Sequence, residues 1–331
     1  MAEEDKRTLG ELNNVGMGRF DRQVGRSSKY GGTNQLKIAL LEARKWALAE
    51  LLAAGFDEAE SLDNIDFLLT GALKVNYGML RANLTRMMPN WLAERWPSWI
   101  AGLVQGKPAQ YVIGEAPFYG RDFLVDERVL IPRPETELLV DWVLNDLKRS
   151  PIQSERPTVL DVGTGSGAIA LTLAAEQASL TLTAADISRD ALAVAWENRK
   201  RFQVENRVKL VESDLFEALG DKRYDIIVSN PPYIRKNGQD EMDESVVAYE
   251  PDLALYADHQ GLALYEAMAK QLADYLQPGG RAYFEIGYDQ GTALKKIFQD
   301  ELPQAQVDLK QDLAGLDRMI RVKLDGNKNI K

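Results

Sequence analysis

The chain has 331 residues, of which 45% are hydrophobic and 27% are charged, and these fractions are ordinary for a globular protein. The absence of cysteine and the single histidine, His259, exclude disulfides, cysteine-based zinc sites and histidine-pair metal motifs. The net charge of −10 does not attract a polyanion over long range, which disfavours a nucleic-acid substrate. There is no membrane-length apolar run and no signal-peptide pattern at the N-terminus, so we expect a cytoplasmic protein without a metal site or membrane contact.

The N-terminal third of the sequence predicts a polar tail followed by helices. Residues 1–33 are polar and rich in glycine, a composition that favours a disordered tail. Apolar residues then recur at helical spacing without an intervening strand pattern, in the segments 36–55, 57–73, 76–87 and 89–106. We therefore predict a helical domain over residues 34–107 that docks the substrate. Its core is expected to contain Trp91, Trp96 and Trp99.

The next segment changes its composition. Residues 108–130 are rich in aromatic and β-branched side chains, and Gly114 and Gly120 mark turns, so we predict a β-hairpin that links two domains. Pro134 then favours the start of a helix, because proline suits the first helical position. Glu135 and Glu137 would stabilise the positive end of that helix dipole.

Strand and helix patterns alternate after residue 156. Strand patterns occur in the segments 157–162, 181–188, 207–215, 224–229 and 281–287. Helical patterns at 168–177 and 189–202 separate the first three of them. This alternation predicts an α/β fold with a parallel sheet and helices on both of its faces. His259 falls in a loop pattern, YADHQG, and is expected at the surface.

The loop DVGTGSG, residues 161–167, connects a predicted strand to a predicted helix. Glycines allow a tight turn and a close ligand, and a helix N-terminus offers free N–H groups. Gly163, Gly165 and Ala168, with Asp186 further on, also fit the dinucleotide-binding pattern. The loop therefore indicates an adenosine-type cofactor and leaves NAD and S-adenosylmethionine both open. Asp161 is equally well explained as a residue that braces the loop.

Two acidic residues follow predicted strands, at the edge of the sheet where ligands bind in this architecture. Asp186 would accept hydrogen bonds from ribose hydroxyls. Asp214 would meet the adenine amino group, with Leu215 packing on the ring, although a surface turn explains Asp214 equally well.

The sequence Asn230-Pro231-Pro232-Tyr233 ends the next predicted strand, because proline cannot donate to a strand ladder. The Asn230 side-chain carbonyl and the Pro231 backbone carbonyl would then present two fixed acceptors, which suit a planar NH2 group. Tyr233 would offer a ring on which that group can stack. Methyl transfer requires a nitrogen held in line behind a sulfonium methyl, and fixed acceptors also stabilise the charge that develops on it. The segment thus predicts methyl transfer to a carboxamide or an exocyclic amine.

Five features follow one another along the chain, namely the helical domain, GKPAQYVIGEAPFYG, LIPRPETE, DVGTGSG and NPPY. In this order they resemble the release-factor glutamine N5-methyltransferases from about residue 35 to 325. The resemblance implies a Rossmann-like class I S-adenosylmethionine-dependent methyltransferase domain over residues 131–325, preceded by the helical domain and the hairpin. Residues 326–331 would form a polar tail. The resemblance also implies methylation of the glutamine in the Gly-Gly-Gln motif of peptide-chain release factors. We further expect a monomer with no direct nucleic-acid contact.

The resemblance also implies roles for individual residues. The cofactor would be bound by Gly163, Thr164, Gly165, Ser166, Gly167, Asp186, Asp214, Leu215 and Asn230. The glutamine amide would be held by Asn230, Pro231, Pro232 and Tyr233, of which Asn230, Pro231 and Tyr233 are the expected catalytic residues. Some relatives carry a bulkier aromatic residue where this chain has Leu215.

Four alternatives have a basis in the sequence. A ribosomal-protein glutamine methyltransferase shares NPPY, but PRPETE resembles the release-factor branch. An adenine-N6 methyltransferase of nucleic acid uses a similar segment, but the charge of −10 and the lack of a dense basic stripe disfavour it. An NAD oxidoreductase would need a hydride-handling residue, for which His259 is a poor candidate. The intact NPPY segment argues against a catalytically inactive scaffold that binds release factors.

Overall fold

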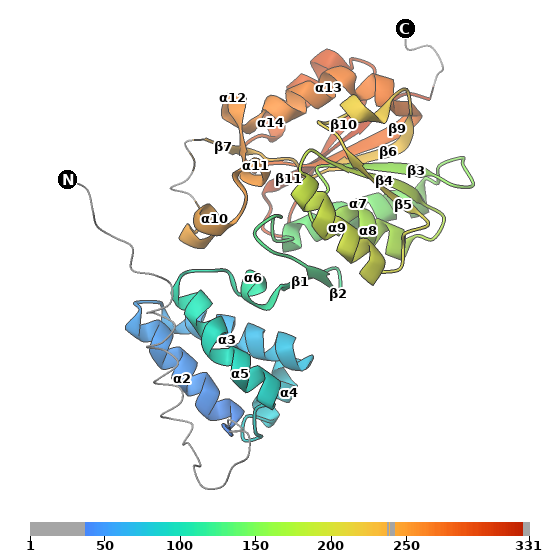
Figure 1. Ribbon diagram of the computed structural model, residues 1–331. Helices are drawn as coiled ribbons and strands as arrows, with labels where there is room; N and C mark the ends of the chain where they lie inside the picture. Colours follow the sequence, from blue (N-terminus) through green and yellow to red (C-terminus); the bar gives the residue numbers. More distant parts are fainter. Residues whose placement is uncertain (1–36, 237, 239–241, 327–331) are drawn as a thin grey trace, which may run out of the picture. The chain divides into compact units, whose positions relative to one another are not determined.

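The computed structural model describes residues 37–236, 238 and 242–326 (Figure 1). The chain divides between Gly114 and Glu115 into two compact units, called here the helical unit and the sheet unit. The tail predicted at 1–33, and all but Gly326 of the tail predicted at 326–331, lie outside the described residues. Among the helices of the described ranges, none combines the length and the apolar composition that a bilayer crossing requires.

The helical unit has the helices that the apolar spacing predicts. They are α2 (Leu40–Ala53), α3 (Glu58–Leu73), α4 (Tyr77–Ala82) and α5 (Asn90–Val104). The unit also contains the short α6 (Ala109–Ile113), which the spacing did not predict. Two of them begin at side-chain caps. Asp57 accepts hydrogen bonds from the Ala59 and Glu60 amides, and Asn76 accepts one from the Met79 amide.

The three tryptophans of α5 differ in burial. Trp96 is fully buried and donates from Nε1 to the Ala43 carbonyl at 3.2 Å, and Trp99 packs partly buried against the same core. The prediction for Trp91 was wrong, because this side chain is 42% exposed. The buried stripe of α5 runs through Leu92 and Trp96 at helical spacing, and Trp91 lies outside that stripe.

The hairpin is shorter than the range 108–130 that the composition predicts. It consists of β1 (Glu115–Phe118) and β2 (Arg121–Leu124), which pair antiparallel. Ala109–Ile113 is helical because Pro108 suits the helix start and Gly114, at φ 80°, ends the helix in the left-handed region. The phenylalanines at positions 118 and 123 are buried in the core of the sheet unit.

The sheet unit is built on a seven-stranded sheet in the order β10-β11-β9-β6-β3-β4-β5. The strands are β3 (Thr158–Val162), β4 (Thr181–Asp186), β5 (Val208–Glu212), β6 (Tyr224–Ser229), β9 (Leu276–Glu285), β10 (Gln306–Gln311) and β11 (Asp317–Lys323). The parallel pairing predicted from the sequence is confirmed for β5, β4, β3, β6 and β9. The unpredicted β11 runs antiparallel to both β9 and β10.

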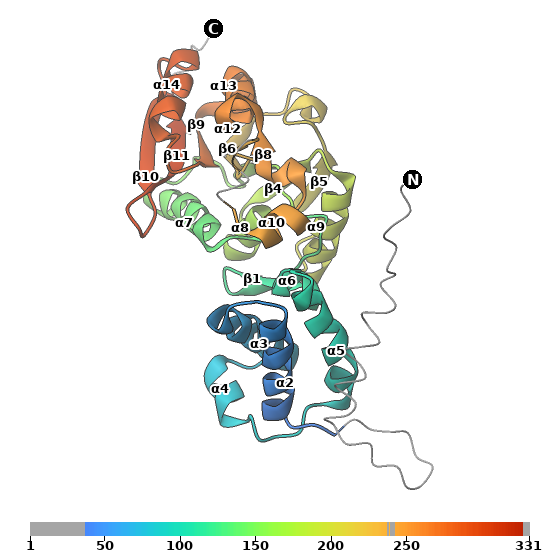
Figure 2. The same ribbon diagram turned by 90° about the vertical axis from the view of Figure 1, so that its left-hand side faces the viewer.

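Helices cover both faces of this sheet (Figures 1 and 2). One face packs against α7 (Pro134–Arg149), α8 (Ala168–Glu176) and α9 (Arg189–Arg201), and the other against α13 (Ala263–Tyr275) and α14 (Gly291–Glu301). Each face has its own hydrophobic core, one around Leu171 and one around Tyr265. The central strands are therefore buried on both sides, as their continuous apolar runs require.

Several short elements lie between β6 and α13. They are β7 (Ile234–Arg235), α10 (Glu244–Tyr249), α11 (Asp252–Leu255), β8 (Tyr256–Ala257) and α12 (Asp258–Gly261), and β7 pairs with β8. His259 is exposed, as predicted, and its Nδ1 lies 2.8 Å from Glu266 Oε2. These elements follow the carboxyl end of β6 and so border the same edge of the sheet as the loops after β3 and β4.

Candidate active site

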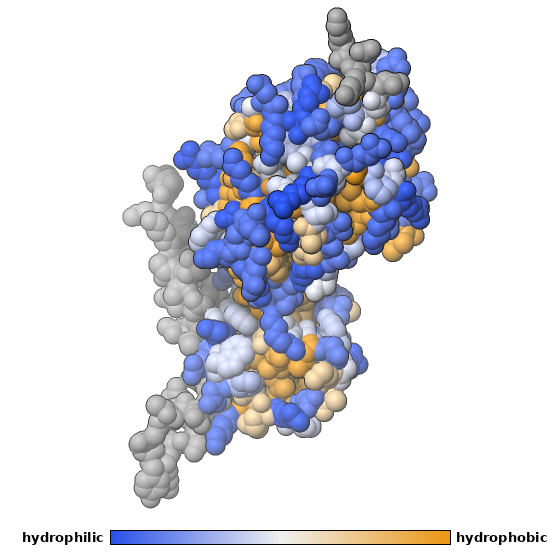
Figure 3. Space-filling view, turned by 90° about the vertical axis from the view of Figure 1, so that its right-hand side faces the viewer, coloured by the Kyte–Doolittle hydropathy of each residue, from blue (hydrophilic) through white to orange (hydrophobic). Residues whose placement is uncertain are grey.

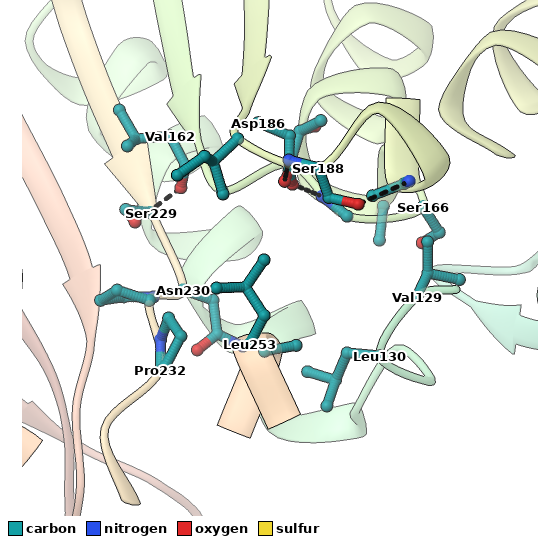
Figure 4. Close-up of a pocket in the computed structure, with 18 of the residues that line it drawn as sticks. Val129, Leu130, Val162, Ser166, Asp186, Ser188, Ser229, Asn230, Pro232 and Leu253 are labelled. Atoms are coloured by element: carbon teal, nitrogen blue, oxygen red, sulfur yellow. Dashed lines mark hydrogen bonds between the residues drawn. The ribbon is translucent and has the colours of Figure 1, made fainter. Parts of the chain in front are cut away.

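Two adjoining cavities lie at the carboxyl ends of the parallel strands. The first is lined by segments that follow four different strands (Figure 4), namely Gly163–Ser166, Asp186–Ser188, Ser213–Leu215 and Asn230–Pro232. The second is lined by Tyr233 and by residues of α10 and α11. Asn230 and Pro231 line both cavities. The sheet therefore brings the residues predicted for the cofactor, apart from Gly167, and those predicted for the substrate amide to one place, with Tyr233 in the second cavity.

The glycines of the loop after β3 have two different tasks. Gly163 and Gly165 have φ values of 72° and 55°, and a Cβ atom at either position would meet nothing within 4 Å. That open space borders the first cavity. Gly167 does not line the cavity, and a Cβ there would lie 2.6 Å from Leu171 Cδ1, so its small size serves the packing of α8. The first turn of α8 leaves amide groups without intrahelical partners, which suits a negatively charged ligand group.

Asp161 braces this loop from behind. Its Oδ2 accepts hydrogen bonds from Thr164 Oγ1 at 2.7 Å and from the Ala170 amide at 3.2 Å, while Oδ1 has no partner among the residues that the structure describes. The side chain is fully buried, and this burial raises the pKa of Asp161 to about 7. Asp161 does not line the cavity, which favours the bracing role over a contact with the cofactor.

Asp186 lies at the end of β4 and lines the first cavity. Its two carboxylate oxygens accept hydrogen bonds from the Gly165 amide at 2.8 Å and the Ser188 amide at 2.9 Å (Figure 4). Burial raises the pKa of Asp186, and these backbone hydrogen bonds oppose the rise. A carboxylate oxygen can accept a second hydrogen bond, so Asp186 can fix the glycine loop and still accept from two ribose hydroxyls.

The loop after β5 forms another side of the first cavity. Asp214 is exposed, and Leu215 is partly buried with a left-handed φ of 45°. Ser213 Oγ donates to the Leu215 carbonyl at 3.0 Å and so fixes this turn. Leu253, on the short helix α11, also faces the cavity and is 59% exposed (Figure 4).

The segment Asn230–Tyr233 is held at both of its ends. Ser229 Oγ donates to the Val162 carbonyl at 2.7 Å, which ties the end of β6 to the end of β3 (Figure 4). The Tyr233 carbonyl accepts from Gln290 Nε2 at 3.0 Å. Gly261 passes the same carbonyl so closely that a Cβ at its φ of 83° would lie 2.0 Å from the oxygen. Only glycine allows this approach, and nothing in the local sequence around Gly261 indicated it.

Two further residues behind Asn230 were not found by sequence reasoning. Asn230 Nδ2 donates to Thr136 Oγ1 at 3.1 Å, and Thr136 Oγ1 donates to Glu285 Oε2 at 2.6 Å. The Tyr233 hydroxyl lies 3.5 Å from the other oxygen of Glu285, a long contact. Glu285 is 1% exposed, and burial raises its pKa to about 7. A charged residue at the end of the apolar strand pattern RAYFE was the one signal in the sequence.

Comparisons with known proteins agree with this architecture. The family model described as methyltransferase small domain matches residues 136–249, and the one described as PrmC N-terminal domain matches residues 42–114. The hMettl16 catalytic domain, solved in complex with the MAT2A 3′UTR hairpin 6, has a TM-score of 0.50 and 14% sequence identity. That match covers 75% of this chain and 87% of the other, and it shows the fold alone.

Curated relatives of this chain, among them the following two, carry the name release factor glutamine methyltransferase. The protein from Lactococcus lactis subsp. lactis is 46% identical over 221 residues, which cover 67% of this chain and 79% of the relative. The protein from Bacillus cereus is 38% identical over 291 residues, which cover 87% of this chain and all of the relative. The predicted class I S-adenosylmethionine-dependent methyltransferase fold is confirmed, and the chain belongs to the release factor glutamine methyltransferase family.

Proposed function

We propose that this chain transfers the methyl group of S-adenosylmethionine to the side-chain amide nitrogen, N5, of the glutamine in the Gly-Gly-Gln motif of peptide-chain release factors. Its membership of the family supports this reaction. The observation that carries it furthest is that Asn230 and Pro231 line both cavities. An amide held by these two residues from the second cavity would face a cofactor held in the first.

The first cavity fits S-adenosylmethionine. The open space beside Gly163 and Gly165, together with the start of α8, would take the methionine carboxylate. Asp186 would accept from the ribose hydroxyls, and Asp214 and Leu215 would contact the adenine. S-adenosylmethionine, when bound, supplies an electrophilic methyl group on a sulfonium centre.

The segment Asn230–Tyr233 would position the nucleophile. The Asn230 Oδ1 and Pro231 carbonyl oxygens would accept the two N–H groups of the glutamine amide, which leaves the nitrogen lone pair directed at the methyl group. The same oxygens would stabilise the positive charge that develops on the nitrogen. The ring of Tyr233 would stack on the planar amide, and Pro231 and Pro232 would hold the segment rigid.

Incubation with a purified release factor and isotopically labelled S-adenosylmethionine, followed by mass spectrometry of the Gly-Gly-Gln peptide, tests this function. We expect one methyl group on the glutamine side chain. Labelling of a ribosomal protein but not of the release factor would favour the other glutamine methyltransferase branch. Labelling of adenine in nucleic acid would contradict a protein substrate.

We further infer that the helical unit, within the predicted domain 34–107, docks the release factor. Large apolar side chains are exposed on this unit at Tyr77, Met79, Met87 and Trp91. Figure 3 shows an apolar area on the surface of this unit. Exposed apolar groups that gather on a surface mark protein-interaction sites.

A chain that begins at Glu115 tests this docking role. It keeps β1 and β2, whose phenylalanines fill the core of the sheet unit, whereas a start at Val129 would remove them. We expect the chain from Glu115 to bind S-adenosylmethionine and to methylate a short Gly-Gly-Gln peptide, but to methylate the intact release factor poorly. Full activity on the intact factor would contradict the docking role.

We also propose that the protein acts as a monomer in the cytoplasm. Release factors act on cytoplasmic ribosomes, which supports the cytoplasmic location. Light scattering on the purified protein and fractionation of cells would test the two statements separately.

A further inference from the structure

A chain of hydrogen bonds runs from the buried carboxyl group of Glu285 to the side chain of Asn230. Glu285 Oε2 accepts from Thr136 Oγ1 at 2.6 Å, and Thr136 Oγ1 accepts from Asn230 Nδ2 at 3.1 Å. Thr136 and Glu285 are 4% and 1% exposed. The short first distance is typical of a hydroxyl that donates to a carboxylate.

The fold fixes the three residues of this hydrogen-bond chain, Asn230, Thr136 and Glu285, relative to one another. Ser229 of β6 pairs with Phe284 of β9 in parallel register, so the next residues, Asn230 and the last residue of β9, Glu285, lie side by side. Thr136 lies in the first turn of α7, which packs against β9. The backbone therefore keeps these three residues adjacent, and a substitution of one side chain alters only the hydrogen bonds that this side chain makes.

Donors and acceptors assign the direction of the hydrogen bonds. A carboxylate only accepts, and a threonine hydroxyl has a single proton, so that proton is committed to Glu285. The remaining lone pairs of Thr136 Oγ1 can only accept, which selects the NH2 group of Asn230 as its partner rather than the carbonyl. The carbonyl oxygen of the Asn230 side chain, Oδ1, then remains available to accept a hydrogen bond from a ligand.

We propose that Glu285 and Thr136 are positioning residues that keep the carbonyl oxygen of Asn230 turned toward the substrate amide. The inference rests on the proposed function, in which that oxygen accepts from the glutamine N–H group. An asparagine amide can rotate by half a turn and present NH2 instead of oxygen at almost the same place. With NH2 presented, two donors would face each other and the glutamine nitrogen would lose its alignment.

Two substitutions at position 136 separate the hydroxyl from the packing. Thr136→Val keeps the shape of the side chain and removes the hydroxyl, whereas Thr136→Ser keeps the hydroxyl. Thr172→Val is the matched control, because Thr172 is fully buried in α8 and its Oγ1 has no partner within the described part of the chain. The full-length protein is assayed for single-turnover methyl transfer to a Gly-Gly-Gln peptide, and the Kd for S-adenosylmethionine is measured by calorimetry.

We expect Thr136→Val to lower kcat by about tenfold or more, the effect of one lost hydrogen bond in the transition state, without a change in cofactor Kd. Thr136→Ser and Thr172→Val should stay close to the wild-type kcat. A wild-type kcat in Thr136→Val would overturn the proposal. A loss in Thr136→Ser as large as in Thr136→Val would also overturn it, because packing alone would then explain both.

A second variant covers the case in which Thr136→Val does not fold, as judged by thermal melting. Glu285→Met keeps a similar length but removes both oxygens, so the Thr136 hydroxyl loses its acceptor and its proton is free to turn toward Asn230. We expect a fall in kcat with an unchanged cofactor Kd, and an unchanged kcat would overturn the proposal. If the wild-type protein itself does not methylate the glutamine, the proposed function fails and this inference fails with it. If the wild-type protein is active and the variants keep its kcat, only the positioning role is contradicted and the proposed function stands.

Discussion

Arg133 and Glu250 form an ion pair that joins the segment before α7 to the segment before α11, with Arg133 Nη2 2.6 Å from Glu250 Oε1. The other oxygen of Glu250 accepts from the Ile131 amide at 3.3 Å. The Glu250 side chain is only 1% exposed, and burial raises its pKa while the Arg133 charge opposes that rise. The pair thus fixes the segment from Leu130 to Arg133, and these two end residues line both cavities.

Arg133→Met should destabilise the protein, because the Glu250 carboxylate would stay buried without its charged partner. We expect a loss of about 1–3 kcal/mol in the free energy of unfolding, measured in urea, at neutral pH. Arg189→Met is the control, since Arg189 pairs with Glu212 at an exposed site where such pairs contribute little. Equal losses in the two variants would contradict a special role for the buried pair.

Asp186→Ala should weaken S-adenosylmethionine binding by about ten- to a hundredfold, because the ribose hydroxyls lose a charged acceptor. The melting temperature should also fall, since Asp186 holds the Gly165 and Ser188 amides. Calorimetry gives the affinity, and Asp190→Ala, at an exposed position in the first turn of α9, is the control. An unchanged affinity in a folded Asp186→Ala protein would remove Asp186 from the cofactor site.

Asn230→Ala should lower kcat by about a hundred- to a thousandfold with little change in stability, because one preorganised acceptor is lost from the transition state. Asn230→Asp keeps one acceptor oxygen but has no NH2 group to donate to Thr136, so we expect partial activity that exceeds that of Asn230→Ala. Single-turnover methyl transfer measures both, with thermal melting as the folding control. Wild-type rates in both variants would show that Asn230 is only a turn residue.

The rate should depend on pH through Glu285. Burial raises the pKa of Glu285 to about 7, and the groups that face it are Thr136, the Tyr233 hydroxyl, Glu135 and Arg318, with Tyr265 on its backbone carbonyl. Only the deprotonated form commits the Thr136 proton, so kcat should rise between about pH 6 and pH 8. In Glu285→Gln this rise should disappear, and a rise that persists would assign it to another group.

The raised pKa values of two buried carboxyl groups also affect the stability of the protein. The folded-state pKa values of Glu285 and Asp161, both raised to about 7, lie above their ordinary values of 4.5 and 3.8, so the folded protein holds these protons more tightly than the unfolded chain. The contribution to stability is fully present below the ordinary values and is lost as the pH rises through about 7. Asp161→Asn should flatten part of this fall in urea-unfolding curves without removing the rise in kcat.

Gly261→Ala should lower both kcat and the melting temperature. The added Cβ would lie 2.0 Å from the Tyr233 carbonyl oxygen, so the segment Asn230–Tyr233 would have to move. Gly220→Ala is the control, because Gly220 also has a positive φ, 61°, but a Cβ there meets nothing within 4 Å. If the two variants lose the same amount of activity, backbone strain rather than the contact with Tyr233 would be the cause.

The sequence predicted those parts of the structure that depend on local patterns. The parallel strands, the glycine loop and the turn at Pro231 each follow from a short period or motif. Strands β10 and β11 were missed because segments such as QVDLKQ mix polar and apolar residues and lie at the edge of the sheet. The helix Ala109–Ile113 was missed because five residues are too few to show a helical period.

Local sequence patterns could not reveal Thr136 and Glu285, the two residues that lie behind Asn230. Thr136 and Glu285 are separated from Asn230 by 94 and 55 positions, and only the register of β6 on β9 and the packing of α7 bring them together. A glutamate is also expected at the surface from its residue type alone, whereas Glu285 is buried. Such contacts depend on tertiary structure, which a single sequence does not display.

The position of β11 has a consequence for the synthesis of this protein. Asp317–Lys323 is the last strand along the described chain, yet it pairs with β9 on one side and β10 on the other. While the ribosome is still adding these residues, this edge of β9 has no partner, so the sheet unit can finish folding only after β11 has emerged. The helical unit, whose core is complete by Ile113, can fold much earlier. A chain that terminates before Asp317 would therefore expose an unpaired strand edge, which invites aggregation and proteolysis.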